Sequence, residues 1–332
     1  MPVAGKAGVL GVRAPLLMPT VFPVDDRCER QSERASVSAN PMTERLISTG
    51  VPAEAAWADE FDLVLERSTG LRSLGVSELI HFRELLYFLT WRDIKVRYKQ
   101  TALGVGWAIL QPVATMVIFT VIFGHVAKIS TDGIPYPIFS YAALIPWLFF
   151  ANAVQLSSTS LTVNPQLITK IYFPRLYLVM APILAGLIDL VVAFGVLIAM
   201  VVYYGVAPSA FGLLALPLFL LLGFLATVGM SAWLAALNVK YRDIRFVVPF
   251  LIQSLLFATP VVYSTSSVSD PWRTLFGLNP MTAVVEGFRW ALAGGSEPRA
   301  ATLALSAVSG IVLFAYGFYY FRRTEKGFAD VI

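Results

Sequence analysis

Ionisable side chains are scarce in the apolar part of this chain, so their positions limit the chemistry it can perform. Asp189 is the one formal charge deep inside a long apolar segment. A carboxylate within a membrane helix is by default a functional group, for example one step of a proton relay. A relay needs several ionisable groups in sequence, and no other apolar segment supplies one. We therefore interpret Asp189 as a hydrogen-bond acceptor that ties its helix to a neighbour, with the relay as the alternative.

Groups for metal, redox or nucleotide chemistry are few. The chain has two histidines, His81 and His125, and a single cysteine, Cys28. These numbers argue against a metal site and exclude an intramolecular disulfide framework. No G-x-x-x-x-G-K-[ST] phosphate-binding loop occurs in the sequence. We therefore expect no metal site, no catalytic residue and no cofactor on this chain.

Amide side chains next to helix-breaking prolines are the most informative polar groups in the apolar segments. Gln111 precedes Pro112, and Gln253 lies seven residues before Pro260. Lipid would leave such amides and the freed backbone groups unsatisfied, which favours helices that line a polar path. Aromatic residues share these segments, although a membrane aromatic belt also explains them. The predicted path residues are Trp107, Gln111, Gln253, Phe257 and Tyr263.

The composition indicates an all-α, polytopic membrane protein. Hydrophobic residues make up 57% of the chain and charged residues 14%, against roughly 25% charged in soluble domains. Six apolar segments are long enough to cross a hydrocarbon core of about 30 Å. They cover residues 101–125, 138–161, 176–204, 211–237, 246–263 and 301–321.

The basic residues of the connections predict the orientation. Twelve lie in one set of connections: Arg92, Lys95, Arg97, Lys99, Lys170, Arg175, Lys240, Arg242, Arg245, Arg322, Arg323 and Lys326. Four lie in the opposite set: Lys128, Arg273, Arg289 and Arg299. Cytoplasmic loops are enriched in Lys and Arg, so we expect both termini in the cytoplasm. The same rule explains the net charge of +4 without a nucleic-acid partner.

An amphipathic helix is predicted just before the first apolar segment. Apolar side chains recur at helical spacing along residues 77–99, at Leu79, Phe82, Leu86, Leu89 and Val96. Charged residues fall between them, and those assigned to this interface helix are Arg92, Asp93, Lys95, Arg97 and Lys99. Such a helix suits the surface of a membrane, where its apolar stripe contacts lipid.

The cytoplasmic connection after the second apolar segment predicts a short helix that docks a soluble partner. Asn164 and Pro165 begin it and Pro174 ends it. An exposed helix that is both apolar and basic is unfavourable unless something covers it. The predicted coupling residues are Asn164, Pro165, Leu167, Ile168, Lys170, Ile171, Phe173, Pro174 and Arg175.

The last outer connection predicts two short re-entrant helices. Asp270-Pro271 and Asn279-Pro280 are both typical of a helix N-cap followed by a first-turn proline. The second helix would present an apolar stripe and end at Gly294-Gly295. We interpret Val284, Val285 and Phe288 as an outer gate. The alternative is a surface cap that only seals the bundle.

Residues 1–70 differ in composition from residues 71–332. Pro, Ser, Ala and charged residues dominate this first part, which predicts a disordered cytoplasmic arm. A misassigned start is the alternative, since Met42 opens a more ordinary terminus.

Several separated motifs resemble one membrane protein family. The run WRDIKVRYKQTALGVGW over residues 91–107, followed by Gln111-Pro112, is similar to the permease subunits of type-2 ABC exporters. The similarity is to the branch that moves O-antigen, teichoic acid and related cell-envelope polysaccharides. The same pattern includes residues 164–175, 241–244, 259–263, 279–281 and 326–330. The resemblance covers about residues 71–332, and the long arm departs from it.

The resemblance implies a homodimeric permease in the inner membrane that works with two copies of a separate ATPase. ATP and Mg²⁺ would bind to that partner, which the interface and coupling helices would contact, while a lipid-linked glycan passes between the permeases. Three alternatives remain. They are a drug or lipid efflux permease of the same superfamily, a polytopic membrane enzyme such as a glycosyltransferase, and a proton-coupled carrier that depends on Asp189.

Overall fold

The computed structural model describes residues 82–99, 101, 103–170, 173–270 and 272–328, and every regular element in these ranges is a helix. Five segments are long and apolar enough to cross a membrane: Gly106–Val126, Tyr136–Val163, Leu176–Tyr204, Ala210–Lys240 and Ala300–Gly327. The expectation of an all-helical, multi-pass membrane protein is therefore confirmed. The predicted arm over residues 1–70 lies outside the described residues, as do residues 77–81 of the interface helix.

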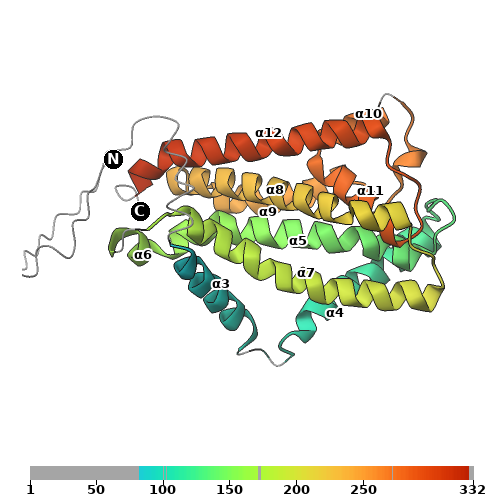
Figure 1. Cartoon of the computed structure of the whole chain (residues 1–332), viewed down its shortest axis with the longest axis horizontal. Helices are drawn as coiled ribbons and strands as arrows, with labels where there is room; N and C mark the ends of the chain where they lie inside the picture. The colour runs from blue at the N-terminus through green and yellow to red at the C-terminus, as the bar shows by residue number, and fades with distance from the viewer. Residues whose placement is uncertain (1–81, 100, 102, 171–172, 271, 329–332) are drawn as a thin grey trace, which may run out of the picture. The chain divides into compact units, whose positions relative to one another are not determined.

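Helix α5 (Tyr136–Val163) forms the centre of the bundle. In its most apolar stretch 78% of the residues are buried, against 6% in the segment Gly106–Val126. It packs against α7 (Leu176–Tyr204), α8 (Ala210–Lys240) and α11 (Pro280–Leu292). Figure 1 shows α5, α7 and α8 running side by side. The other long apolar helices therefore present more of their surface to lipid or to a partner.

Helix α9 (Ile244–Ala258) is shorter than the fifth predicted span. The expected segment reached residue 263, but the helix ends at Ala258. Pro260 pushes the preceding Thr259 into extended backbone (φ −98°, ψ 136°), which stops the helix. Fifteen residues span about 22 Å, less than the roughly 30 Å of a hydrocarbon core. The predicted span over residues 246–263, and with it the total of six, therefore stays a prediction.

Helix α12 (Ala300–Thr324) packs along α8 at very short range. Gly229 of α8 and Gly317 of α12 lie at the crossing, where a Cβ added to Gly317 would lie 2.0 Å from the carbonyl oxygen of Gly229. Only residues without side chains allow the two backbones to approach this closely.

Short helices mark the two ends of the bundle (Figure 1). Helix α6 (Pro165–Lys170) follows α5 at one end, where α3 (Arg83–Tyr98) also contacts the bundle through α7. Helix α10 (Trp272–Leu275) precedes α11 at the opposite end. Helix α4 (Gly106–Phe119) continues through π-helical turns to Val126 and reaches that same end.

Candidate functional site

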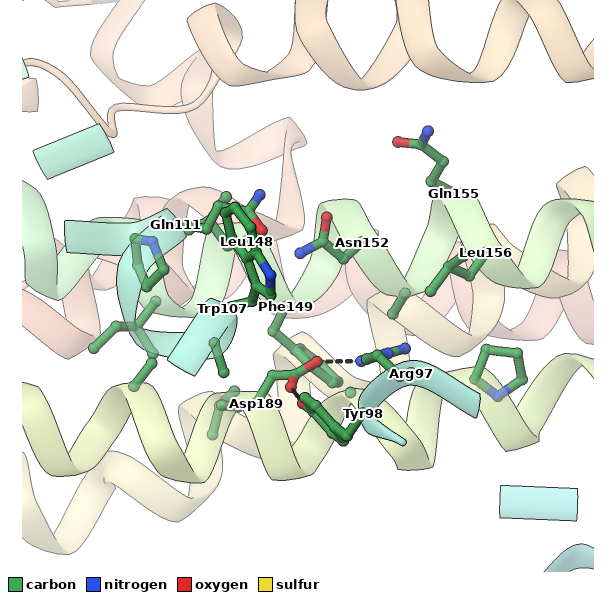
Figure 2. Close-up of a pocket in the computed structure, with 18 of the residues that line it drawn as sticks. Arg97, Tyr98, Trp107, Gln111, Leu148, Phe149, Asn152, Gln155, Leu156 and Asp189 are labelled. Carbon is green, nitrogen blue, oxygen red and sulfur yellow. Dashed lines mark hydrogen bonds and ion pairs between the residues drawn. The ribbon is translucent and has the colours of Figure 1, made fainter. Parts of the chain in front are cut away.

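A cavity of about 380 Å³ lies between α3, α4, α5 and α7. Its size is at the lower end of the range for small-molecule sites, roughly 300–1,000 Å³. The polar residues that line it are Arg97, Tyr98, Gln111, Asn152, Gln155 and Asp189, and Trp107 and Phe149 supply aromatic rings. Figure 2 shows Trp107 and Gln111 together on one side of Asn152, and Asp189 beside Arg97 and Tyr98.

Asp189 ties α7 to the end of α3. One carboxylate oxygen accepts a hydrogen bond from Arg97 Nη1 and forms an ion pair with it, and the other accepts from the Tyr98 hydroxyl. The prediction that Asp189 links its helix to a neighbour is confirmed. Arg97 and Asp189 are the only charged side chains among the described residues that line this cavity. The alternative of a relay of several ionisable groups finds no further members there.

Helical spacing explains how the cavity wall forms. Leu148, Asn152 and Gln155 lie three to four positions apart on α5 and therefore share one face of the helix. Trp107 and Gln111 share a face of α4 for the same reason. Within the described ranges no group of three or more His, Cys, Asp or Glu side chains is placed to hold a metal ion. The arrangement is suited to binding by hydrogen bonds and ring contacts.

The five predicted path residues are not brought together in one place. Trp107 and Gln111 line the cavity, whereas Gln253 and Phe257 belong to α9, which does not contribute to it. Phe257 is 62% exposed. The Tyr263 hydroxyl donates to the carbonyl of Phe257 (3.0 Å). A shared path for these five residues stays a prediction.

The interface helix is present, but its exposed face is more aromatic than the sequence pattern suggested. Leu89 is buried as expected, whereas Val96 is 74% exposed. The Arg92 guanidinium pairs with Asp93 (3.0 Å) and reaches the Asn164 side chain (3.5 Å), and the Lys95 ammonium lies over the Trp91 ring (5.4 Å from the centroid). The exposed face carries Tyr87, Phe88, Trp91, Lys95 and Lys99, a composition that suits a membrane interface.

The prediction of an exposed apolar face on the connection after α5 is wrong for two of its residues. Ile168 and Phe173 are only 5% and 6% exposed, because they pack into an apolar cluster with residues such as Leu176 and Phe321. Ile171 lies outside the described residues. Pro165, Gln166, Thr169 and Lys170 are the exposed side chains of α6. The coupling role of this connection stays a prediction.

The C-terminal end of the connection after α5 contacts the residues that follow α12. The Arg175 backbone N–H donates to Glu325 Oε1 (3.2 Å), and its guanidinium donates to the Glu325 carbonyl. That guanidinium also lies over the Phe328 ring. Arg175, one of the predicted coupling residues, therefore joins the connection to the C-terminal end of the bundle.

Two short helices, α10 and α11, are present where the last outer connection was predicted, and the cap of the second is confirmed. The Asn279 side chain accepts a hydrogen bond from the Met281 backbone N–H (3.0 Å), and Pro280 occupies the first turn. After Leu292 the chain turns through Gly294 at a φ of +72°, a conformation that favours glycine. Asp270 forms an ion pair with Arg299 (2.8 Å), and its role as the first cap stays a prediction.

The predicted gate residues are buried in the bundle. Val284, Val285 and Phe288 are each at most 1% exposed. Gly287, beside them, faces the Phe219 ring of α8 so closely that a Cβ would lie 2.5 Å from it. This packing favours the alternative of a cap that seals the bundle, and a moving gate at these residues stays a prediction.

Arg289 organises this end of the bundle, although from the sequence it was predicted only as a loop cation. It is 5% exposed and donates to the backbone carbonyls of Phe139 (3.2 Å), Tyr263 (3.2 Å) and Val261 (2.6 Å), with the Phe139 ring 3.6 Å from its guanidinium. The sequence did contain a signal for the burial of Arg289, since this residue lies on the apolar stripe of α11, three positions before Leu292.

Polar groups from three segments meet around Arg289. Ser264 and Ser266 donate to the Asp132 carboxylate (2.6 and 2.8 Å), and Thr265 donates to Glu286. Burial raises the pKa of Glu286, and the hydrogen bond from Thr265 and the charge of Arg289 oppose that shift. These contacts fix the irregular backbone after α9 against α11.

Comparisons with known proteins identify relatives along most of the chain. The family model of the ABC-2 type transporter matches residues 84–293. The chain is 30% identical over 261 residues to the O-antigen export system permease protein RfbA of Myxococcus xanthus, which covers 77% of this chain and 98% of that protein. It is 25% identical over 249 residues to RfbA of Klebsiella pneumoniae, covering 75% and 95%. It is 24% identical over 235 residues to the polysialic acid transport protein KpsM of Escherichia coli, covering 71% and 91%.

Proposed function

The chain belongs to the ABC-2 type transporter family, and from this membership we propose that it is the membrane permease of an ATP-driven exporter of cell-envelope polysaccharide. The observation that carries the proposal is the similarity to permeases named for O-antigen export and polysialic acid transport, which covers 71–77% of this chain and 91–98% of those proteins. The cargo is a lipid-linked glycan that moves from the cytoplasmic to the outer face of the inner membrane.

The working unit that we propose is a pair of these chains with a separate ATPase. ATP and Mg²⁺ bind to that partner, because the present sequence has no phosphate-binding loop. Both termini lie in the cytoplasm, in keeping with the excess of basic residues in one set of connections. In this arrangement α9 and the irregular segment after it form the fifth of six crossings in chain order. Helices α10 and α11 then re-enter the membrane from outside.

Deletion of the gene tests the proposed function. We expect the surface polysaccharide to be lost and lipid-linked glycan to accumulate inside the cell, since synthesis continues without export. Both pools are measured by extraction and immunoblotting, with the intact gene returned as the control. Normal surface polymer together with new sensitivity to drugs, or altered phospholipid distribution, would instead indicate an efflux permease of the same superfamily.

Purification of the chain alone and together with its ATPase tests whether ATP hydrolysis belongs to the separate partner. The isolated chain should release no phosphate from ATP, and the co-purified complex should hydrolyse it. Sustained hydrolysis by the isolated chain, with contaminating ATPases removed, would contradict the proposal.

A further inference from the structure

We propose that the cavity between α3, α4, α5 and α7 binds one uncharged sugar residue of the exported glycan. This inference rests on the proposed function for the presence of a glycan. It adds a binding site formed within a single copy of the chain, and it specifies the charge of the unit that binds there. The volume of about 380 Å³ suits a small polar ring rather than a long segment of polymer.

The charge of the cavity favours a neutral ligand. Among the described residues that line it, the only charged side chains are Arg97 and Asp189, and each neutralises the other in an ion pair. A phosphate or a carboxylate-bearing sugar would have to compete with Asp189 for the guanidinium. It would also place a second negative charge next to the Asp189 carboxylate, and like charges this close repel each other. An uncharged sugar meets neither obstacle.

The amide groups match the hydroxyl groups of a sugar. Gln111, Asn152 and Gln155 line the cavity, and no side-chain hydrogen bond joins any of them to another described residue. Each amide offers both donors and an acceptor, as a sugar hydroxyl does. At the depth of a membrane-spanning helix, unsatisfied amides are unfavourable unless water or a polar ligand reaches them. Three such groups around one cavity therefore indicate a polyhydroxylated ligand.

An aromatic ring supplies the second feature of sugar recognition. The Trp107 side chain is 51% exposed and lines the cavity one helical turn before Gln111. Figure 2 shows the Trp107 ring and Gln111 close together, near Asn152. A sugar ring has an apolar C–H face that packs on an aromatic surface while its hydroxyls point to the side. The cavity presents both surfaces at once.

Binding of soluble trisaccharides to the purified full-length permease in lipid nanodiscs tests this site. The probes are neutral maltotriose and mannotriose, acidic sialyllactose and inorganic pyrophosphate, and binding is measured by saturation-transfer NMR. We expect saturable binding of a neutral trisaccharide and little binding of either anion. Trp107→Leu should weaken binding of the neutral trisaccharide about tenfold or more, because it removes one aromatic contact worth roughly 1.4 kcal/mol. Trp272→Leu, which removes an exposed tryptophan outside the cavity, should leave it unchanged.

Stronger binding of sialyllactose or pyrophosphate than of the neutral probes would overturn the proposed charge class. Unchanged affinity in Trp107→Leu, with a normal melting temperature, would place the site elsewhere. A permease that restores polymer export but binds neither neutral trisaccharide would refute the cavity site and leave the proposed function intact. Conversely, neutral binding in a chain whose deletion spares the surface polymer would refute that function and retain the site.

Discussion

Asp189 shows how one charged side chain can fix a helix against a membrane-spanning bundle. Its two oxygens accept from consecutive residues of α3, Arg97 and Tyr98. Removing a charge from water costs several kcal/mol, and a hydrogen-bonded partner offsets that cost. The side chains of Arg97 and Asp189 remain 26% and 27% exposed, so the cost is below that of full burial. The pair therefore holds the C-terminal end of α3 at the cavity.

A double-mutant cycle on this ion pair measures the coupling. Arg97→Leu and Asp189→Leu should each lower stability by about 1–3 kcal/mol, because each leaves the other charge without its partner. The double variant should cost less than the sum of the two, by about 1 kcal/mol. Thermal unfolding in detergent provides the measurement. Asp270→Leu is the control, since the side chains of Asp270 and its ion-pair partner Arg299 are 59% and 46% exposed, and it should cost about 0–1 kcal/mol.

Additive effects of Arg97→Leu and Asp189→Leu would show that the contact contributes little. Asp189→Asn separates the two interpretations of the carboxylate, because the amide keeps an acceptor for Tyr98 and removes only the charge. Export should survive this change if the role is structural. Loss of export at a normal protein level would support a proton relay.

Arg289 illustrates what a sequence can reveal about a single residue and what it cannot. Its place on the apolar stripe of α11, near Val285 and Leu292, was visible from helical spacing. Its partners were not, because they are backbone carbonyls of Phe139, Val261 and Tyr263, and any residue supplies a carbonyl. Backbone acceptors carry no signature in residue type.

At the scale of elements, the contact between α8 and α12 depends on two glycines. Gly317→Ala should lower the melting temperature clearly, because its Cβ would lie 2.0 Å from the Gly229 carbonyl oxygen and the backbones would have to separate. We expect a loss of roughly 1–3 kcal/mol, typical of overpacking. Gly195→Ala in α7 is the matched control. Its Cβ would meet no atom within 4 Å, and alanine favours a helix by about 1 kcal/mol. A Gly317→Ala protein as stable as the Gly195→Ala protein would contradict the close crossing.

The elements that the sequence predicted best are those whose signal is length and hydropathy. Five of the six predicted spans correspond to long apolar helical segments such as α5 and α7, and the Asn279 cap was also predicted correctly. The direction in which apolar side chains point was not predictable. Ile168 and Phe173 pack inward and Phe257 points outward, yet all three are apolar. In a membrane protein, surfaces that contact lipid and surfaces that contact protein have similar composition, so periodicity does not separate them.

The cavity was predictable only in part, because the sequence does not show which face of a membrane helix points into the protein. Trp107 and Gln111 were identified because an amide beside Pro112 is unusual in an apolar span. Asn152 and Gln155 have no such neighbour, and their place in the site depends on how α5 is rotated within the bundle. Arg97 was assigned to the interface helix, and its contact with Asp189 connects residues 92 positions apart.

At the scale of the whole molecule, the connections at the end of the bundle that carries α6 are joined to one another. The Asn164 side chain accepts from Arg92 of α3, and Arg175 is bound to Glu325 at the end of α12. A force applied to α6 would therefore reach both the interface helix and the last span. This arrangement suits a permease that receives its energy from a separate ATPase at that surface.

The exposed side chains of α6 provide the last prediction. Thr169 and Lys170 point away from the bundle, whereas Ile168 packs into it. Thr169→Asp with Lys170→Glu should abolish co-purification of the ATPase and surface polymer, yet leave the melting temperature of the permease unchanged. Ile168→Asp should instead destabilise the protein by about 3 kcal/mol or more, because it buries a carboxylate without a partner. Lys128→Glu makes the same charge reversal on an exposed lysine at the opposite end of α5 and should preserve both readouts. Normal ATPase capture by the Thr169→Asp, Lys170→Glu protein would show that the partner does not contact this face of α6.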